Sequence, residues 1–111
     1  MLRIAAIILG GFLPFASNGQ SVTIEIYLHP KNETERKLLQ WYLGGVRDGL
    51  TLSSSVASAD KLFCMPENLA LTIEQAESIM EGWAKRRTNI DQMLLATALF
   101  AGLQETFPCP K

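Results

Sequence analysis

The first nineteen residues follow the three-part pattern of an export signal. This pattern limits the folded domain to the residues that follow it. Arg3 is the only charged residue before Glu25, and the stretch 4–13 is apolar. A small and polar run follows Pro14 and ends at Gly19. A positive start, an apolar centre and small residues before a cleavage point are typical of a secretory signal peptide. We therefore expect residues 1–19 to be removed, leaving one domain at 20–111.

The alternative is a start that stays attached and anchors the chain. Roughly ten apolar residues are too few to cross a bilayer, which needs about twenty. We therefore expect no stable membrane anchor.

The two cysteines, Cys64 and Cys109, are an even number in a chain expected to be exported, which favours a disulfide. A domain this small is only marginally stabilised by burial, and a ring of this length adds roughly 4 kcal/mol in the chain-entropy model. The alternatives are a metal site or a reactive thiol. Neither is supported, because the sequence has no CxxC pattern and its single histidine, His29, is remote.

The charge balance argues against nucleic acid and anionic membranes as partners. Ten basic residues less Arg3 leave nine, against eleven acidic residues, so the expected net charge is near −2. Binding to nucleic acid requires a clustered basic surface, and the sequence contains no basic block.

Three helices are predicted from apolar spacing and capping residues. Asn32 is a good N-cap for a helix over 33–52, whose Gly45 and Gly49 share one face that we expect another helix to cross closely. Thr72 and Gln75 form a capping box for a second helix over 73–87. Asn89, with Gln92 three residues on, is expected to cap a third, widely apolar helix that stops at Phe107.

The segment 22–28 is ambiguous. Apolar and polar residues alternate there, as in a β-strand, but nothing later in the chain offers a partner strand. A short helix is the alternative. The fold class that we expect is all-α, a small bundle of three or four helices with one disulfide.

No catalytic constellation is visible, so we expect no enzyme, no cofactor and no metal. One histidine nearly excludes a triad, and neither HExxH nor GxSxG occurs. Glu74, Glu77 and Glu81 have the spacing of a solvated helix face, with no apolar pocket to raise a carboxyl pKa.

Protein binding remains as the function class, and five residues are candidates for a contact surface. Trp41 lies beside the apolar stripe of its helix and so is a better candidate anchor than Trp83, although core packing is the ordinary role of a tryptophan. The other four form the turn between the second and third helices, which is otherwise a solvated loop: Arg86, Arg87, Thr88 and Asn89.

The order of these features resembles a known family. Tyr42-Leu43-Gly44-Gly45-Val46-Arg47-Asp48 is followed by Phe63-Cys64-Met65-Pro66, a helix with Gln75, an Ala- and Leu-rich helix and Phe107-Pro108-Cys109. This is similar to the Rap/Tai family of periplasmic immunity proteins of bacterial type VI secretion, over about two thirds of the chain.

The resemblance implies an all-helical fold, a Cys64–Cys109 disulfide, a homodimer and a periplasmic location. It also implies a function, the binding and steric occlusion of a peptidoglycan amidase toxin. Two features depart from the family. A further cysteine pair is replaced by apolar residues near Leu28 and at Leu39, which we expect to pack in the core. Arg87-Thr88-Asn89 replaces a His-Pro-Glu-like turn, which leaves the partner's identity open.

Two alternatives remain at the level of sequence. One is a small periplasmic chaperone of the acid-stress type, in which the apolar third helix would become exposed at low pH. The other is an adaptor relative without a toxin partner, which the sequence does not distinguish from an immunity protein.

Overall fold

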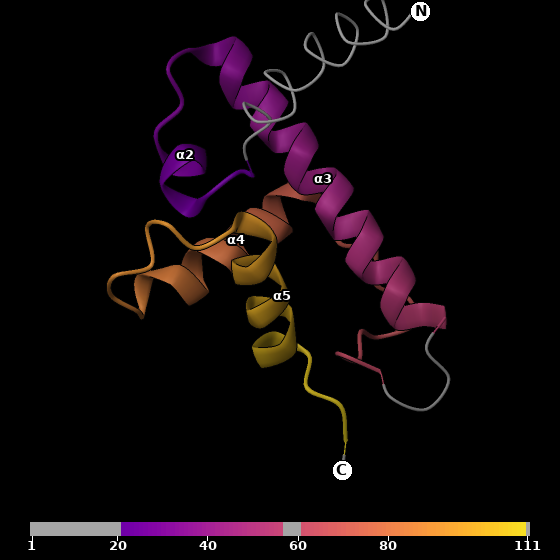
Figure 1. Cartoon of the computed structure of the whole chain (residues 1–111). Coiled ribbons are helices and arrows are strands. Elements are labelled where there is room, and N and C mark those ends of the chain that lie inside the picture. The colour runs from indigo at the N-terminus through magenta and orange to yellow at the C-terminus, as the bar shows by residue number, and fades with distance from the viewer. Residues whose placement is uncertain (1–20, 57–60, 111) are drawn as a thin grey trace, which may run out of the picture.

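The computed structural model describes residues 21–56 and 61–110, and four helices lie within them. They are α2 (Ile24–Leu28), α3 (Glu33–Val56), α4 (Ile73–Lys85) and α5 (Leu95–Thr106). Figure 1 shows α3 along one edge of this fold, with α2 near its N-terminal half and α4 and α5 beside one another. The expected all-α class is confirmed. The predicted signal peptide, with its cleavage point after Gly19, lies outside the described residues.

Most of the ambiguous segment 22–28 is helical, because α2 spans Ile24–Leu28, and its period-two pattern was misleading there. The Thr23 hydroxyl accepts a hydrogen bond from the Ile26 amide at 3.2 Å and caps α2. Ile24 and Tyr27, three positions apart, are the buried residues of this helix. Ile26 and Leu28 stay exposed, so the expectation that Leu28 packs in the core is wrong.

The main chain just before α2 is bonded to the chain just before α5. Thr23 and Leu94 form an isolated antiparallel bridge, in which the Leu95 amide donates to the Val22 carbonyl at 2.8 Å. The Ile24 amide donates to the Met93 carbonyl at 3.0 Å. Residues 22–23, whose sequence is strand-like, are thus extended and paired with the chain before α5.

α3 begins as predicted and runs four residues beyond the predicted end. The Asn32 side chain accepts from the Glu35 amide at 2.8 Å, which confirms the N-cap. The serines 53–55 lie within the helix, where Ser54 is buried and its hydroxyl donates to the Phe63 carbonyl at 2.7 Å. Leu39 is buried, as expected for the position of the missing cysteine.

No described helix crosses α3 closely at Gly45 and Gly49, so this expectation is wrong. A methyl group built at either glycine meets nothing within 4 Å. The close approach lies instead between α4 and α5, where a methyl group on Gly102 would lie 3.0 Å from the Ile79 carbonyl oxygen. Among the described helices, α4 and α5 share the most extensive contact, with a close approach at Gly102.

α4 carries the predicted capping box, and α5 starts later than predicted. Thr72 accepts from the Gln75 amide, and the Gln75 side chain accepts from the Thr72 amide. α5 begins at Leu95, so Asn89 does not cap it. Gln92, expected in the first turn, donates through its side chain to the Glu25 carboxylate at 3.0 Å. The bonds to residues 22–25 keep 91–94 out of the helix.

The core lies where α3, α4 and α5 meet, with α2 closing one end. Cys64 and Cys109 form the expected disulfide, with Cα atoms 4.9 Å apart, and the Cys64 amide donates to the Phe107 carbonyl at 2.8 Å. The end of α5 is thereby fastened to the loop before α4. The largest fully buried side chains are those of Ile24, Leu43, Phe63, Met80, Leu95, Leu99 and Leu103.

Candidate binding surface

The turn 86–89 is exposed and leaves α4 with defined geometry. The Arg87 amide still donates to the Ala84 carbonyl at 3.1 Å, so the last turn of the helix is closed. Asn89 has φ of 60°, a left-handed conformation that asparagine adopts more readily than most residues. All four candidate residues of the turn, Arg86, Arg87, Thr88 and Asn89, are exposed. The sequence prediction of an exposed loop is therefore confirmed.

Both arginines of the turn pair with one carboxylate on α5. Arg86 and Arg87 each donate through Nη2 to a different oxygen of Glu105, Arg87 at 3.2 Å. Arg87 also lies over the Trp83 ring, with Cζ 4.1 Å from the ring centroid, and donates to the Trp83 carbonyl at 2.9 Å. An arginine held in this way retains N–H donors for a partner but loses less side-chain entropy on binding.

A cavity of about 240 Å³ opens beside the turn, between α2 and the end of α4. Its apolar lining includes Ile24, Leu28, Ala84 and Ile90, and its charged lining includes residues of both signs. This size and composition suit one large apolar side chain that carries a polar or charged tip. The residues of the turn that line the cavity are Arg87 and Asn89.

Trp41 lies on a different surface. It is 73% exposed, whereas Trp83 is 8% exposed and belongs to the core. Figure 1 shows α3, which carries Trp41, and the turn after α4 on opposite sides of the fold. The structure therefore does not unite Trp41 with the turn 86–89 in one binding surface.

Comparison with protein families decides the class of this molecule. The model of the Rap1a immunity proteins matches residues 19–109. The chain belongs to the Rap1a immunity protein family. No curated protein and no solved structure gives a significant match.

The family match covers α2 to α5 and both cysteines, so the candidate surfaces all lie within the Rap1a immunity region. Immunity proteins act on a toxin, and the partner of this chain is accordingly a protein. No cluster of three or more metal-ligating side chains occurs in the part of the chain that the structure describes. Within the same ranges, no helix combines the length and the apolarity needed to span a bilayer.

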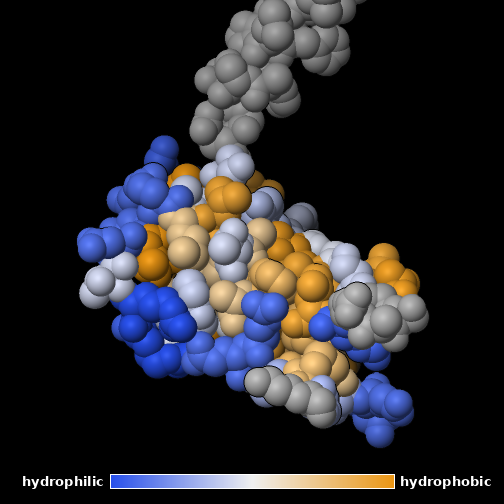
Figure 2. All heavy atoms as spheres, turned by 60° about the horizontal axis from the view of Figure 1, so that its bottom comes forward, coloured by the Kyte–Doolittle hydropathy of each residue, from blue (hydrophilic) through white to orange (hydrophobic). Residues whose placement is uncertain are grey.

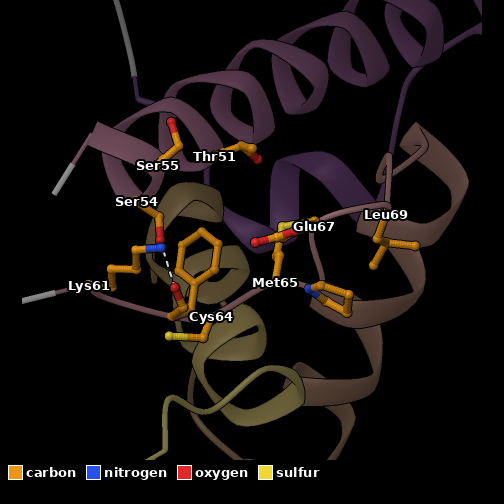
Figure 3. A pocket seen from close by; sticks show the side chains of 10 residues that line it. Thr51, Ser54, Ser55, Lys61, Cys64, Met65, Glu67 and Leu69 are labelled. Carbon is orange, nitrogen blue, oxygen red and sulfur yellow. Dashed lines mark hydrogen bonds between the residues drawn. The ribbon is translucent and has the colours of Figure 1, made fainter. Parts of the chain in front are cut away.

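A second cavity in this Rap1a family chain was not predicted from sequence. It measures about 250 Å³ and lies between the end of α3 and the loop that carries the disulfide. Figure 3 shows the Ser54 hydroxyl bonded to the Phe63 carbonyl, with Ser55 and Thr51 on the same helix and Lys61 and Cys64 opposite. The three consecutive serines 53–55 were the available signal in the sequence.

Apolar side chains also contribute to the surface. Figure 2 shows apolar atoms in a band across one face of the molecule, with hydrophilic atoms gathered along its margin. Large apolar residues that stay exposed mark contact sites when they lie together. Those with the greatest exposure are on α3: Leu38, Trp41, Leu52 and Val56.

Proposed function

We propose that this Rap1a family protein works in the periplasm, after export and signal removal, by binding a peptidoglycan amidase toxin and blocking its cleft. Membership of the immunity family carries the proposal. It acts by binding and catalyses nothing itself. We also propose that it is a homodimer, as the resemblance to the Rap/Tai proteins implies.

The turn 86–89 with its neighbouring cavity is the surface that we propose for the toxin. Its support is the combination of exposed arginines held in place by Glu105 and an apolar recess beside them. Interfaces are dominated by a few anchors that fill desolvated pockets, and arginine is enriched among them. A toxin side chain seated in the cavity, against Arg87 and Asn89, would leave Arg86 and Thr88 to contact the rim of the toxin cleft.

The test is binding to, and inhibition of, peptidoglycan amidases, beginning with one encoded near the gene for this protein where the neighbourhood holds one. Nanomolar binding that abolishes peptidoglycan cleavage is the expected result for a dedicated inhibitor. If neither that enzyme nor other peptidoglycan amidases bind at micromolar concentration, the amidase proposal is wrong.

Two residues of α2 give a matched pair of variants for the location of the site. Leu28 lines the cavity and Ile26 does not, and the two are similarly exposed, at 43% and 41%. Leu28→Arg is expected to weaken amidase binding by about thirtyfold, since a filled pocket contributes ~2 kcal/mol or more. Ile26→Arg is expected to leave binding unchanged. Equal affinities of the two variants would place the toxin on another surface.

A further inference from the structure

The outward face of α3 carries an apolar stripe that no described segment covers. Five large side chains lie on it in two groups, three within residues 38–42 and two at 52 and 56, on the side of the helix away from the buried Leu39 and Leu43. Gly45 and Gly49 occupy the same face between the two groups. We call them the α3 outer stripe: Leu38 (58% exposed), Trp41 (73%), Tyr42 (39%), Leu52 (64%) and Val56 (70%).

The stripe is symmetrical about its middle. Counted from Arg47, apolar or small residues on this face occur at equal distances toward both ends of the helix. The matched pairs are Leu38 with Val56, Tyr42 with Leu52, and Gly45 with Gly49. An antiparallel two-fold contact between two copies places each such pair in register, because residue i of one copy then meets residue j of the other and j meets i.

The glycines lie at the centre of this arrangement. Nothing lies within 4 Å of a methyl group built on Gly45 or Gly49, so the middle of the stripe is a shallow saddle. In the antiparallel register, Gly45 of each copy faces Gly49 of its partner. The two helices can then approach to the short end of the usual 8–10 Å interaxial range, which brings the larger side chains at both ends into contact.

A groove on one flank of the stripe matches the most exposed side chain. It measures about 480 Å³ and lies between the C-terminal half of α3 and the loop 65–71, with Leu52, Ser55, Met65 and Leu69 in its lining. Helical periodicity puts Trp41 on the same flank of α3 as Leu52 and Ser55. In the two-fold register, Trp41 of one copy reaches the level of residue 53 in the other. The indole therefore faces the groove of the second copy.

Charge favours the antiparallel orientation over the parallel one. The N-terminal end of α3 carries Glu33, Glu35, Arg36 and Lys37, whereas residues 53–56 are uncharged. A parallel pair would place like charges beside like charges and align the two helix dipoles. An antiparallel pair opposes the dipoles and keeps the two charged N-terminal ends apart.

The area is sufficient for a specific pair. Side chains exposed to this degree offer on the order of 500 Å² per copy, so that a dimer would bury about 1,000 Å², the lower limit of specific interfaces. We propose that the α3 outer stripe binds the same stripe of a second copy, antiparallel and centred on Gly45 and Gly49, with each Trp41 seated in the groove of the other chain. This inference rests on the proposed homodimer but not on the toxin.

The experiment is sedimentation equilibrium of the mature, oxidised protein, with Tyr42→Lys and Leu52→Glu as variants. In the proposed register, residue 42 meets residue 52 of the other copy twice. Each variant alone places two charges against apolar side chains, and at least tenfold weaker self-association is expected. A mixture of the two forms a heterodimer with one Lys–Glu pair and one native Tyr–Leu pair, so association returns to near the wild-type level.

Leu94→Glu is the matched control, since Leu94 is an exposed leucine outside α3 and its change is expected to leave association unchanged. Circular dichroism checks that each variant keeps its helices. A wild-type dimer that survives Leu52→Glu would place the interface on another face. A mixture that does not recover would overturn the antiparallel register. A monomeric wild type at high micromolar concentration would refute the dimer itself, while amidase binding, measured separately, still decides the toxin proposal.

Discussion

The Tyr27 hydroxyl donates a hydrogen bond to the Glu77 carboxylate and joins α2 to α4 across fifty positions of sequence. The interpretation of Glu77 as part of a solvated face was therefore wrong, because this residue is half-buried against α2. Burial raises the pKa of Tyr27 well above its ordinary value of 10.0, and the bond to Glu77 and the charges of Glu77 and Glu81 raise it further; Arg36 opposes them. The tyrosine thus stays protonated in the fold.

We predict that the stability of the protein falls above about pH 10 and that Tyr27→Phe removes part of this fall. The folded state holds the Tyr27 proton more tightly than the unfolded state, so its contribution is fully present below pH 10 and declines above it, by up to about 1.4 kcal/mol per pH unit. Urea unfolding of both proteins as a function of pH measures the difference. Identical slopes would contradict the prediction.

At neutral pH, the same substitution is expected to destabilise the fold by about 1–2 kcal/mol. The half-buried Glu77 carboxylate would lose the hydrogen bond from α2, and unsatisfied buried acceptors cost this amount. Urea unfolding at pH 7 provides the value, and a fully stable Tyr27→Phe protein would show that the bond contributes nothing.

Gly102→Ala is expected to destabilise the fold by about 1–3 kcal/mol, as for other overpacked contacts. The new methyl group would lie 2.8 Å from Ile79 Cγ2 and 3.0 Å from the Ile79 carbonyl oxygen, so that α4 and α5 must separate. Gly82→Ala is the matched control, because its nearest neighbour is a flexible arginine tip at 3.8 Å. That variant should gain up to about 1 kcal/mol from helix propensity. Thermal unfolding that ranks the two the other way would contradict the packing described.

The double variant Cys64→Ser, Cys109→Ser is expected to lose up to roughly 4 kcal/mol, the value for a ring of this length. The loop and the chain after α5 would then be held mainly by the bond between the Cys64 amide and the Phe107 carbonyl. Wild-type protein with a reductant should unfold at the same urea concentration as the double variant. A reductant effect on the double variant would point to another cause.

Glu105→Gln is expected to loosen the turn 86–89 with little loss of global stability. The two ion pairs are largely exposed, and such pairs contribute about 1 kcal/mol or less. Hydrogen exchange of the turn amides should accelerate, and under the proposed function the toxin should bind more weakly because the arginines are no longer held. Glu67→Gln, an exposed loop glutamate, is the control. Unchanged exchange in the turn would show that Glu105 does not order it.

Local signals predicted the helix starts that depend on local contacts. Asn32 and the Thr72–Gln75 box both cap helices where the sequence placed them. The start of α5 was predicted wrongly because its position depends on main-chain hydrogen bonds between 22–25 and 91–95. No residue close to position 95 in the sequence indicates these bonds.

The features of the candidate surfaces also fall into two groups, those set by local sequence and those set by tertiary packing. Exposure of the turn 86–89 follows from its composition, and exposure of Trp41 follows from its place beside the apolar stripe of its helix. The pairing of Arg86 and Arg87 with Glu105, eighteen or nineteen positions away, and the cavity beside Leu28 are products of tertiary packing. Sequence periodicity gave neither of them.

The bonds between residues 22–25 and 91–95 also bear on the order of folding. α4 and α5 are neighbours in sequence and require only a short loop to close, whereas the segment before α2 must find a partner about seventy residues away, at a larger entropy cost. We expect α4 and α5 to pair early and 22–28 to dock last, which pulse-labelled hydrogen exchange would resolve. A newly made chain would then possess its helices before it possesses the cavity beside the turn, and under the proposed function it could bind its toxin there only after the final step.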